Sequence, residues 1–409
     1  MSRTCTPSGD NIFRVENQTA VDALAECATI NGTIFLSGSY TGPFYLPNVR
    51  NITGDLSWER NPTGHYNPAP SSIDLPDLQA VRGWYMGRIE TLANVSAPKL
   101  ETVHWSLDLG YVYDVDLRSW TDAELLRIAG NLSSLRLDSL REIRQSAQIC
   151  NMDNCDSSKA PTTALDVFLP SLETVGDIEV QGKLSNLAIP KLREVRESRY
   201  GFTNLKVMTG GGPPIDVAFP QLEYVGGSIS LEGDFNSLSL PKLNTSMDTW
   251  FVVRARDPLD INLPFEEASF IHLAGNISSV QFPNLRNLTN FLVESDLRLD
   301  CKYLQNTIMA AANKTEDSVR CESAGDPSSI SGHHLSLGEK IGTGVVVSVV
   351  GLVGIIVALL YLWRRQQRAT SKRDSNDSLA NGPPSFAEGR DRLDDFGEFE
   401  DMSRRYSAR

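Results

Sequence analysis

Between residues 44 and 288, apolar and polar positions follow one short pattern that recurs many times. The pattern reads apolar, any residue, apolar, Pro, any residue, Leu, two of any kind, then Val or Ile, as in VFLPSLETV at 167–175. The ten segments that carry it are 44–54, 73–83, 95–105, 135–143, 167–177, 187–195, 217–227, 238–246, 261–270 and 280–288, with Asp138 replacing the proline in the fourth. Successive copies lie 19 to 40 residues apart, which predicts a unit of about 20 residues with loop insertions.

This pattern favours short parallel strands stacked coil upon coil. The two apolar residues before each proline have a period of two, so they point to one side of a strand. Proline lacks the N–H that a strand ladder needs, which places it at a corner where a strand ends. The following Leu and Val turn inward on the next side, and stacked coils share one apolar core. We therefore predict a mainly β protein with a parallel β-helix of about ten coils over residues 1–322.

A leucine-rich repeat is the alternative architecture. It expects L-x-x-L-x-L-x-x-N with a helix or a turn behind each strand. No asparagine recurs in register in this sequence, whereas proline does, so the β-helix is the preferred prediction.

A second pattern, an uncharged apolar run, fills Ile341–Trp363. As a helix it would be about 34 Å long, enough to cross a hydrocarbon core of about 30 Å. Five basic residues lie at 364–373, and the positive-inside rule then places the C-terminal side in the cytosol. Small residues fall near one helical face, at Gly344, Ser348, Gly351, Gly354 and Ala358. Such a face would suit a dimer formed through the span, although small residues are common in any transmembrane helix.

The span divides the chain into four predicted parts. They are a β-helical ectodomain at 1–322, a Ser/Gly-rich stalk at 323–340, the transmembrane helix at 341–363 and a disordered cytosolic tail at 364–409. The basic start of the tail would attract anionic lipids. Since the tail contains no kinase domain, any signalling through it would need a recruited cytosolic adaptor.

Cysteines and sequons are typical of an extracellular protein. All six cysteines precede the span, which indicates disulfides, although sequence leaves fifteen connectivities open. We predict nearest-neighbour pairing, as Cys5–Cys27, Cys150–Cys155 and Cys301–Cys321. Nine N-x-S/T sequons also precede the span and predict N-glycosylation at Asn17, Asn31, Asn51, Asn94, Asn131, Asn244, Asn276, Asn287 and Asn313.

The N-terminus departs from this picture. The first residues, MSRTCTPSGDN, contain no apolar segment of the kind that a secretory signal has. Because export of a large ectodomain requires such a signal, we expect the native start to lie upstream of Met1.

Composition and motifs argue against several function classes. The chain has 51 acidic and 38 basic side chains, a net charge of -13, which disfavours nucleic-acid binding. It contains five histidines and no G-x-S-x-G, H-E-x-x-H or P-loop motif, so we expect no catalytic site, metal or cofactor. Since polysaccharide-cleaving enzymes also use β-helices, a β-helical carbohydrate-active enzyme is a remote alternative.

Aromatic residues concentrate between residues 40 and 120. Those on the outside of a β-helix would stack on sugar rings or anchor a protein partner, whereas packing within the protein is the commoner role of any single aromatic residue. Apolar residues occupy the ninth and eleventh positions after several repeat prolines, which predicts that Trp58 and Tyr85 lie in the core and that Trp84 faces out. The segment Gly110–Trp120 has the character of an insertion that leaves the stack as a binding loop. The predicted ligand-face residues are Trp84, Tyr111, Tyr113 and Trp120.

Taken with GTIFLSGSYTG at 32–42 and the cysteine-bearing ends, the repeats resemble the receptor L-domain, the β-helix of the ligand-binding lobes of insulin and EGF receptors. More closely, residues 5–325 are similar to fungal cell-wall organisation proteins related to sporulation-specific protein 2. The resemblance implies a right-handed, leucine-rich-repeat-like β-helix in a glycosylated surface protein linked to wall integrity. Many such proteins carry a GPI anchor, whereas this chain has an apolar span followed by a polar tail.

We therefore expect a non-catalytic, single-pass type I glycoprotein of the plasma membrane, with its ectodomain toward the cell wall. The expected partners are the membrane itself and a cell-wall polysaccharide or a wall or surface glycoprotein. The alternative is a surface receptor or wall sensor that binds a glycan or protein ligand and recruits a cytosolic partner through its tail.

Overall fold

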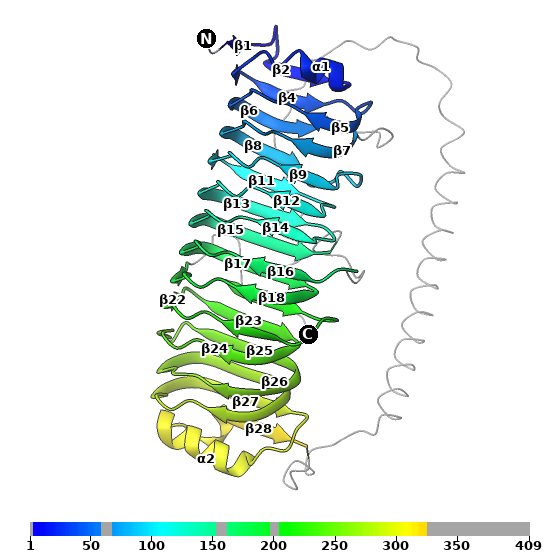
Figure 1. The fold of residues 1–409 in the computed structure, drawn as a ribbon. Coiled ribbons are helices and arrows are strands. Elements are labelled where there is room, and N and C mark those ends of the chain that lie inside the picture. Colours follow the sequence, from blue (N-terminus) through cyan, green and yellow to red (C-terminus); the bar gives the residue numbers. More distant parts are fainter. Residues whose placement is uncertain (1–2, 59–67, 153–161, 197–203, 325–409) are drawn as a thin grey trace, which may run out of the picture. The chain divides into compact units, whose positions relative to one another are not determined.

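The chain winds into a parallel β-helix whose coils stack along one axis (Figure 1). The computed structural model describes residues 3–58, 68–152, 162–196 and 204–324. Within these residues the helices are α1 (Gln18–Asp22), α2 (Cys301–Ala312) and the short 3-10 helix η1 (Glu316–Ser318). The prediction of a mainly β solenoid is confirmed.

Each coil has three faces, joined at corners. The first face is short and ends at the Val or Ile of the repeat, the long face follows, and the third face carries the apolar-x-apolar part before the proline. Strands confined to the first face are β1 (Thr4–Cys5), β3 (Thr29–Ile30), β10 (Thr102–Val103), β19 (Glu194–Val195) and β22 (Tyr224–Val225). Strands confined to the long face are β2 (Ile12–Val15), β4 (Thr33–Leu36), β11 (Ser106–Leu109), β20 (Leu205–Thr209), β23 (Ser228–Gly233) and β28 (Val319–Ser323).

Other strands run through a corner or lie on the third face. Those that continue from the first face into the long face are β6 (Asn51–Trp58), β8 (Ala80–Met86), β13 (Asp122–Ala129), β15 (Glu142–Asn151), β17 (Thr174–Gly182) and β27 (Asn287–Ser295). The third face holds β5 (Thr41–Tyr45), β7 (Ala69–Asp74), β9 (Asn94–Ser96), β12 (Asp114–Asp116), β14 (Ser134–Arg136), β16 (Leu165–Phe168), β18 (Leu184–Ala188), β21 (Ile215–Ala218) and β24 (Phe235–Ser239). Two strands reach it from the long face, namely β25 (Trp250–Asn262) and β26 (Glu267–Gln281), of which β26 already begins on the first face.

The repeat positions fall where the sequence pattern predicts. In the coil around Pro98, strand β9 ends at Ser96, directly before the corner. The apolar positions on either side, Val95, Leu100 and Val103, are at most 3% exposed. All strand pairs are parallel, so equivalent apolar residues of successive coils lie directly above one another and form one continuous core. Strands on three faces distinguish this fold from a leucine-rich repeat, which has one strand per repeat.

The stack is longer than the ten coils predicted. In the described part of the chain, the long face consists of fourteen successive strands, in the order β2, β4, β6, β8, β11, β13, β15, β17, β20, β23, β25, β26, β27 and β28. Two coils at the N-terminus and one at the C-terminus lack the proline motif. A further coil lies between Pro98 and Asp138, where Val115, Leu117 and Trp120 occupy the apolar positions and an arginine replaces the proline.

Disulfides and short helices occupy the two ends of the stack. Cys5–Cys27 and Cys301–Cys321 are both formed, which confirms two of the predicted pairs. Cys150 is also disulfide-bonded, and its predicted partner, Cys155, lies outside the described residues. Helix α2 lies against β27 and β28 at the end of the stack (Figure 1). Its apolar side chains Leu304 and Ile308 are buried, so the helix covers the last coil.

Residues 325–409 lie outside the described residues. They comprise the predicted transmembrane helix, the predicted tail and all of the predicted stalk except residues 323 and 324. Within the described part of the chain, no helix has the length and apolarity that a membrane crossing requires.

Alkaline pH is expected to destabilise the N-terminal coils through Tyr40. This phenol is fully buried, and its hydroxyl donates to the Pro43 carbonyl at 2.9 Å. Burial, with a smaller contribution from Asp22, raises the pKa of Tyr40 to about 12. Above pH 10 the unfolded chain releases this proton while the folded chain keeps it, so stability falls between pH 10 and 12 by about 2–3 kcal/mol.

The measurement is the urea midpoint of the wild type and of Tyr40→Phe at pH 9 and at pH 11. The variant should lose less stability than the wild type between the two values, because phenylalanine has no proton to release. Equal losses in both proteins would contradict this assignment.

Candidate functional site

Trp84, predicted to face out, lies in the core with its side chain 0% exposed. The reason is that the coil containing Trp84 has one residue fewer at its corner than the two neighbouring coils. Leu56 follows Ile52 by four positions, whereas Trp84 follows Val81 by three, and the two strands nevertheless pair Ile52 with Val81 and Leu56 with Trp84. The missing residue reverses the inward and outward parity of the rest of the coil.

The same shift moves Tyr85 from the predicted core to the outer side of the long face. It pairs with Asp108 of the next coil, and its half-buried ring lies over Gly83. Burial raises the pKa of Tyr85 above its ordinary value. Trp58, the other predicted core aromatic, is partly buried and packs against the core.

Gly110–Trp120, predicted to be a binding loop, is a regular part of the stack. Strand β12 pairs with β9 on one side and β14 on the other, and Trp120 is 0% exposed. Tyr113 is exposed and Tyr111 half-buried, with the backbone of Tyr111 in the left-handed region. The four predicted ligand-face residues therefore do not form one surface, because two of them belong to the core.

The nine sequon asparagines are distributed unevenly over the faces. None of them is buried. They lie at the two end helices, at corners, on the first face and on the third face, and none lies on the long face. The long-face segments are 12–15, 33–36, 55–58, 83–86, 106–109, 125–129, 146–151, 177–182, 205–209, 228–233, 250–255, 270–275, 290–295 and 319–323. The outer side of the long face is thus the side that predicted N-glycans leave open.

The middle of the long face carries a row of linked polar side chains. Arg127 pairs with Asp108 at 2.9 Å and donates to the amide oxygen of Gln148 at 3.2 Å. Gln148 in turn donates to Glu179 at 3.0 Å, and Lys206 pairs with Glu179 at 2.6 Å. Successive coils thus place donors beside acceptors, which avoids repulsion between like charges in neighbouring strands.

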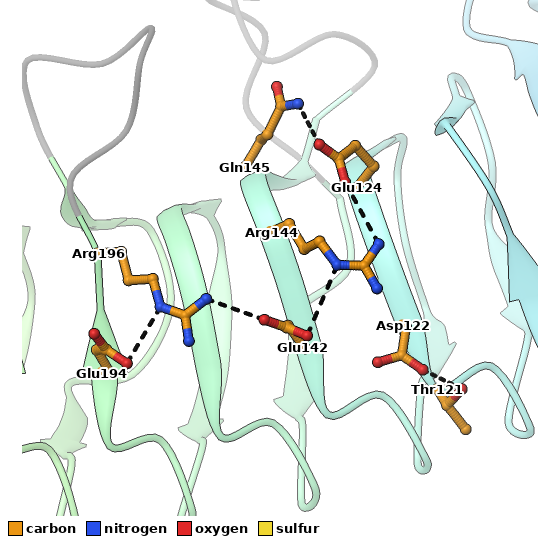
Figure 2. Close-up of polar contacts among 8 residues, drawn as sticks. All are labelled: Thr121, Asp122, Glu124, Glu142, Arg144, Gln145, Glu194 and Arg196. Carbon is orange, nitrogen blue, oxygen red and sulfur yellow. Dashed lines mark hydrogen bonds and ion pairs between the residues drawn. The ribbon is translucent and has the colours of Figure 1, made fainter.

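A second polar row follows the corner between the first and the long face (Figure 2). Arg144 lies 3.6 Å from Glu124 and 3.8 Å from Glu142. Arg196 lies 3.0 Å from Glu142 and 3.2 Å from Glu194, and the hydrogen bond to Glu142 raises the pKa of Arg196. Figure 2 shows that the two arginines bridge the carboxylates into one chain across several coils.

The carboxylates of this corner row are engaged in ion pairs with the two arginines. Its side chains are partly exposed, so each ion pair contributes little by itself. The Gln145 amide donates to Glu124 and so extends the row, and in a separate contact the Thr121 hydroxyl donates to Asp122 at 2.7 Å. In the described part of the chain, no three metal-ligating side chains are grouped as a metal site would need.

An aromatic patch lies on the outer side of the long face toward its C-terminal end. Trp250 of β25 is 53% exposed, and its ring centroid lies 5.3 Å from that of Phe270 on β26. The next outward-facing position after Trp250 on β25 is Val252, which pairs with His272 of β26. His272 in turn pairs with Leu292 of β27, so it lies between the two apolar side chains. We call these four apolar side chains, Trp250, Val252, Phe270 and Leu292, the aromatic patch.

The prediction of ligand residues between 40 and 120 overlooked this patch. A signal was present in WFVV at 250–253, where apolar residues occupy both sides of the strand. A strand with one side in the core and the other in solvent alternates apolar and polar residues. An uninterrupted apolar run therefore indicates that the outer side of the strand also packs against another group.

Comparison with known proteins gives a distant relationship. A curated protein named "Protein ecm33", from Aspergillus fumigatus, is 25% identical over 254 residues, which are 59% of this chain and 56% of that protein. The match thus spans little more than half of the relative's length. No family model matches the chain, and no solved structure matches it. The chain is a distant homologue of this fungal protein.

Proposed function

We propose that this chain is a non-catalytic surface glycoprotein that supports organisation of the fungal-type cell wall at the plasma membrane. The observation that carries the proposal is the disulfide-closed β-helix with nine accessible sequons, in a chain distantly homologous to the fungal protein ecm33. Disulfides and glycans both require passage through an oxidising secretory compartment. The resemblance to cell-wall organisation proteins then suggests the wall as the place of action.

The physical basis of this role is a stiff, elongated binding surface. Each coil contacts its neighbours through parallel ladders, so a surface built from many coils keeps its side chains in fixed register. The apolar run at 341–363 would hold this surface at the membrane, with residues 364–409 in the cytosol. The carboxylates of the corner row are engaged with arginines and neutral donors, which fits a binding protein better than an enzyme.

A wall sensor is the second candidate. The tail carries a basic cluster at 364–373 and an acidic block at 391–401, and such a charge pattern suits a membrane-adjacent segment that recruits a partner. Under this reading the ectodomain would bind a wall glycan or glycoprotein and the tail would report it.

Complementation of a deletion strain under cell-wall stress tests both candidates. We expect the deletion to cause sensitivity, and the full chain to restore growth. A version that ends after Arg373 keeps the membrane run and should rescue fully if the anchored ectodomain suffices. A version that ends before Ile341 is the matched control, and it should fail if anchoring matters.

Two results would change the proposal. A deletion strain as resistant as the wild type would contradict a role in the wall. Loss of rescue by the version that ends after Arg373, when it reaches the surface in normal amounts, would favour the sensor.

A further inference from the structure

The aromatic patch has the build of a platform for a ring-shaped ligand. Trp250 and Phe270 are direct partners on adjacent parallel strands, so their backbones fix the spacing of the two rings. The rings are tilted by 51° to one another, and the Trp250 side chain is more than half exposed. An exposed indole offers its electron-rich face to a ligand, and weakly positive C–H groups are the natural partner of such a face.

Paired charges lie on one side of the patch, toward the C-terminal ends of its strands. Arg254 faces Glu232 at 3.9 Å, and the imidazole of His272 lies 3.0 Å from Glu294. Because these charges are matched within the surface, a ligand of strong net charge would have to break existing pairs. The His272 imidazole, whose ring centroid lies 6.0 Å from that of Phe270, and its partner Glu294 still offer a hydrogen-bond donor and acceptors to hydroxyl groups.

The position of the patch favours a long ligand. It lies on the long face, the side that carries none of the nine sequons, and the polar row from Asp108 to Lys206 lies on the same face. An extended chain of sugars that crosses the strands would meet one coil after another on a face that carries no sequon. A stable protein partner needs about 1,200–2,000 Å² of total interface, more than four apolar side chains provide.

We propose that the aromatic patch binds a neutral polysaccharide, with one pyranose ring stacked on Trp250 and the hydroxyl groups of a neighbouring sugar hydrogen-bonded by His272, beside Phe270, and by its partner Glu294. Phe270 supports the indole and extends the platform to the next coil. The choice of a polysaccharide rests on the proposed function at the cell wall, whereas the choice of the patch rests on exposure, ring geometry and the missing sequons.

Binding to the purified, glycosylated full-length chain tests the proposal. The probes are a soluble β-glucan, chitin oligomers and mannan, with polygalacturonate as the charged comparison, and the readouts are calorimetry and tryptophan fluorescence. We expect at least one neutral probe to bind, and Trp250→Ala to weaken that binding at least tenfold. Phe270→Ala should weaken it less. Trp105→Ala is the matched control, because Trp105 is 65% exposed but lies away from the patch, and it should bind like the wild type.

Several outcomes would overturn the proposal. They are no binding to any neutral probe, equal binding by Trp250→Ala and wild type, and tighter binding of polygalacturonate than of the neutral polymers. A change of oligomeric state in Trp250→Ala, with unchanged glycan binding, would assign the patch to self-association instead. Thermal unfolding of each variant confirms that it is folded.

The wall-stress assay separates this proposal from the proposed function. If the deletion strain is sensitive but Trp250→Ala restores full resistance, the patch proposal fails while the wall function stands. If the deletion strain is not sensitive, the wall function fails, and the binding measurement alone decides whether the patch is a glycan site.

Discussion

Replacement of Trp84 by alanine is expected to lower the free energy of unfolding by about 3–5 kcal/mol. The side chain is fully buried between equivalent residues of the coils above and below, since Trp84 pairs with Leu56 and with Leu107. Its removal would leave a cavity that the stacked strands cannot close, because their ladders fix the distance between coils. Chemical denaturation followed by far-UV circular dichroism measures the loss.

Two further variants make this test specific. The indole N–H of Trp84 has no hydrogen-bond partner among the described residues, so Trp84→Phe should cost clearly less than Trp84→Ala. Trp105→Ala should change stability by no more than about 0.5 kcal/mol, because the Trp105 side chain is 65% exposed. A stable Trp84→Ala variant that had lost ligand binding would restore the original expectation that this residue faces out.

Replacement of Gly233 by alanine should also destabilise the stack strongly, by about 3 kcal/mol or more. Gly233 ends strand β23 with a φ of 135°, a conformation that residues with a Cβ rarely adopt. A Cβ at this position would overlap the Thr209 carbonyl oxygen of the neighbouring coil. Because that oxygen is backbone, relief would require the two coils to move apart.

Gly42→Ala is the matched control for Gly233→Ala. Gly42 also has a positive φ, of 84°, but a Cβ there would meet no atom within 4 Å. It should therefore cost only the backbone strain, about 1 kcal/mol. Equal losses for the two variants, measured by urea denaturation, would mean that the overlap with Thr209 does not matter.

The repeat made most of the fold predictable from sequence. Proline after an apolar-x-apolar pair, with Leu two and Val five positions later, defines one corner and four inward positions by local chemistry alone. The nearest-neighbour pairs Cys5–Cys27 and Cys301–Cys321 follow from the same logic, because cysteines about one coil apart lie side by side in a stack. By contrast, the coil with Arg118 at the proline position escaped detection, although its apolar positions match the pattern.

The prediction of the ligand-face residues depended on which residues of each strand face inward and which face outward, and the sequence did not determine this. Whether Trp84 faces in or out is decided at the corner after Val81, where one coil has a residue fewer than its neighbours. The alternation of inward and outward side chains begins anew after each corner. Only the pairing with the adjacent coils fixes which residue of the new strand faces inward. The aromatic patch was missed for a related reason: Trp250 and Phe270 are twenty residues apart and meet only because their strands are paired in register.

The sequence by itself therefore determined the architecture of the coil, the closed ends and the predicted glycosylation sites, because each rests on residues close together in the chain. The tertiary structure decided the number of coils, the direction in which each aromatic residue points and the face that is left open, because these depend on register between coils. Inward and outward positions alternate at every residue, so a single missing residue exchanges core and surface for the rest of that coil.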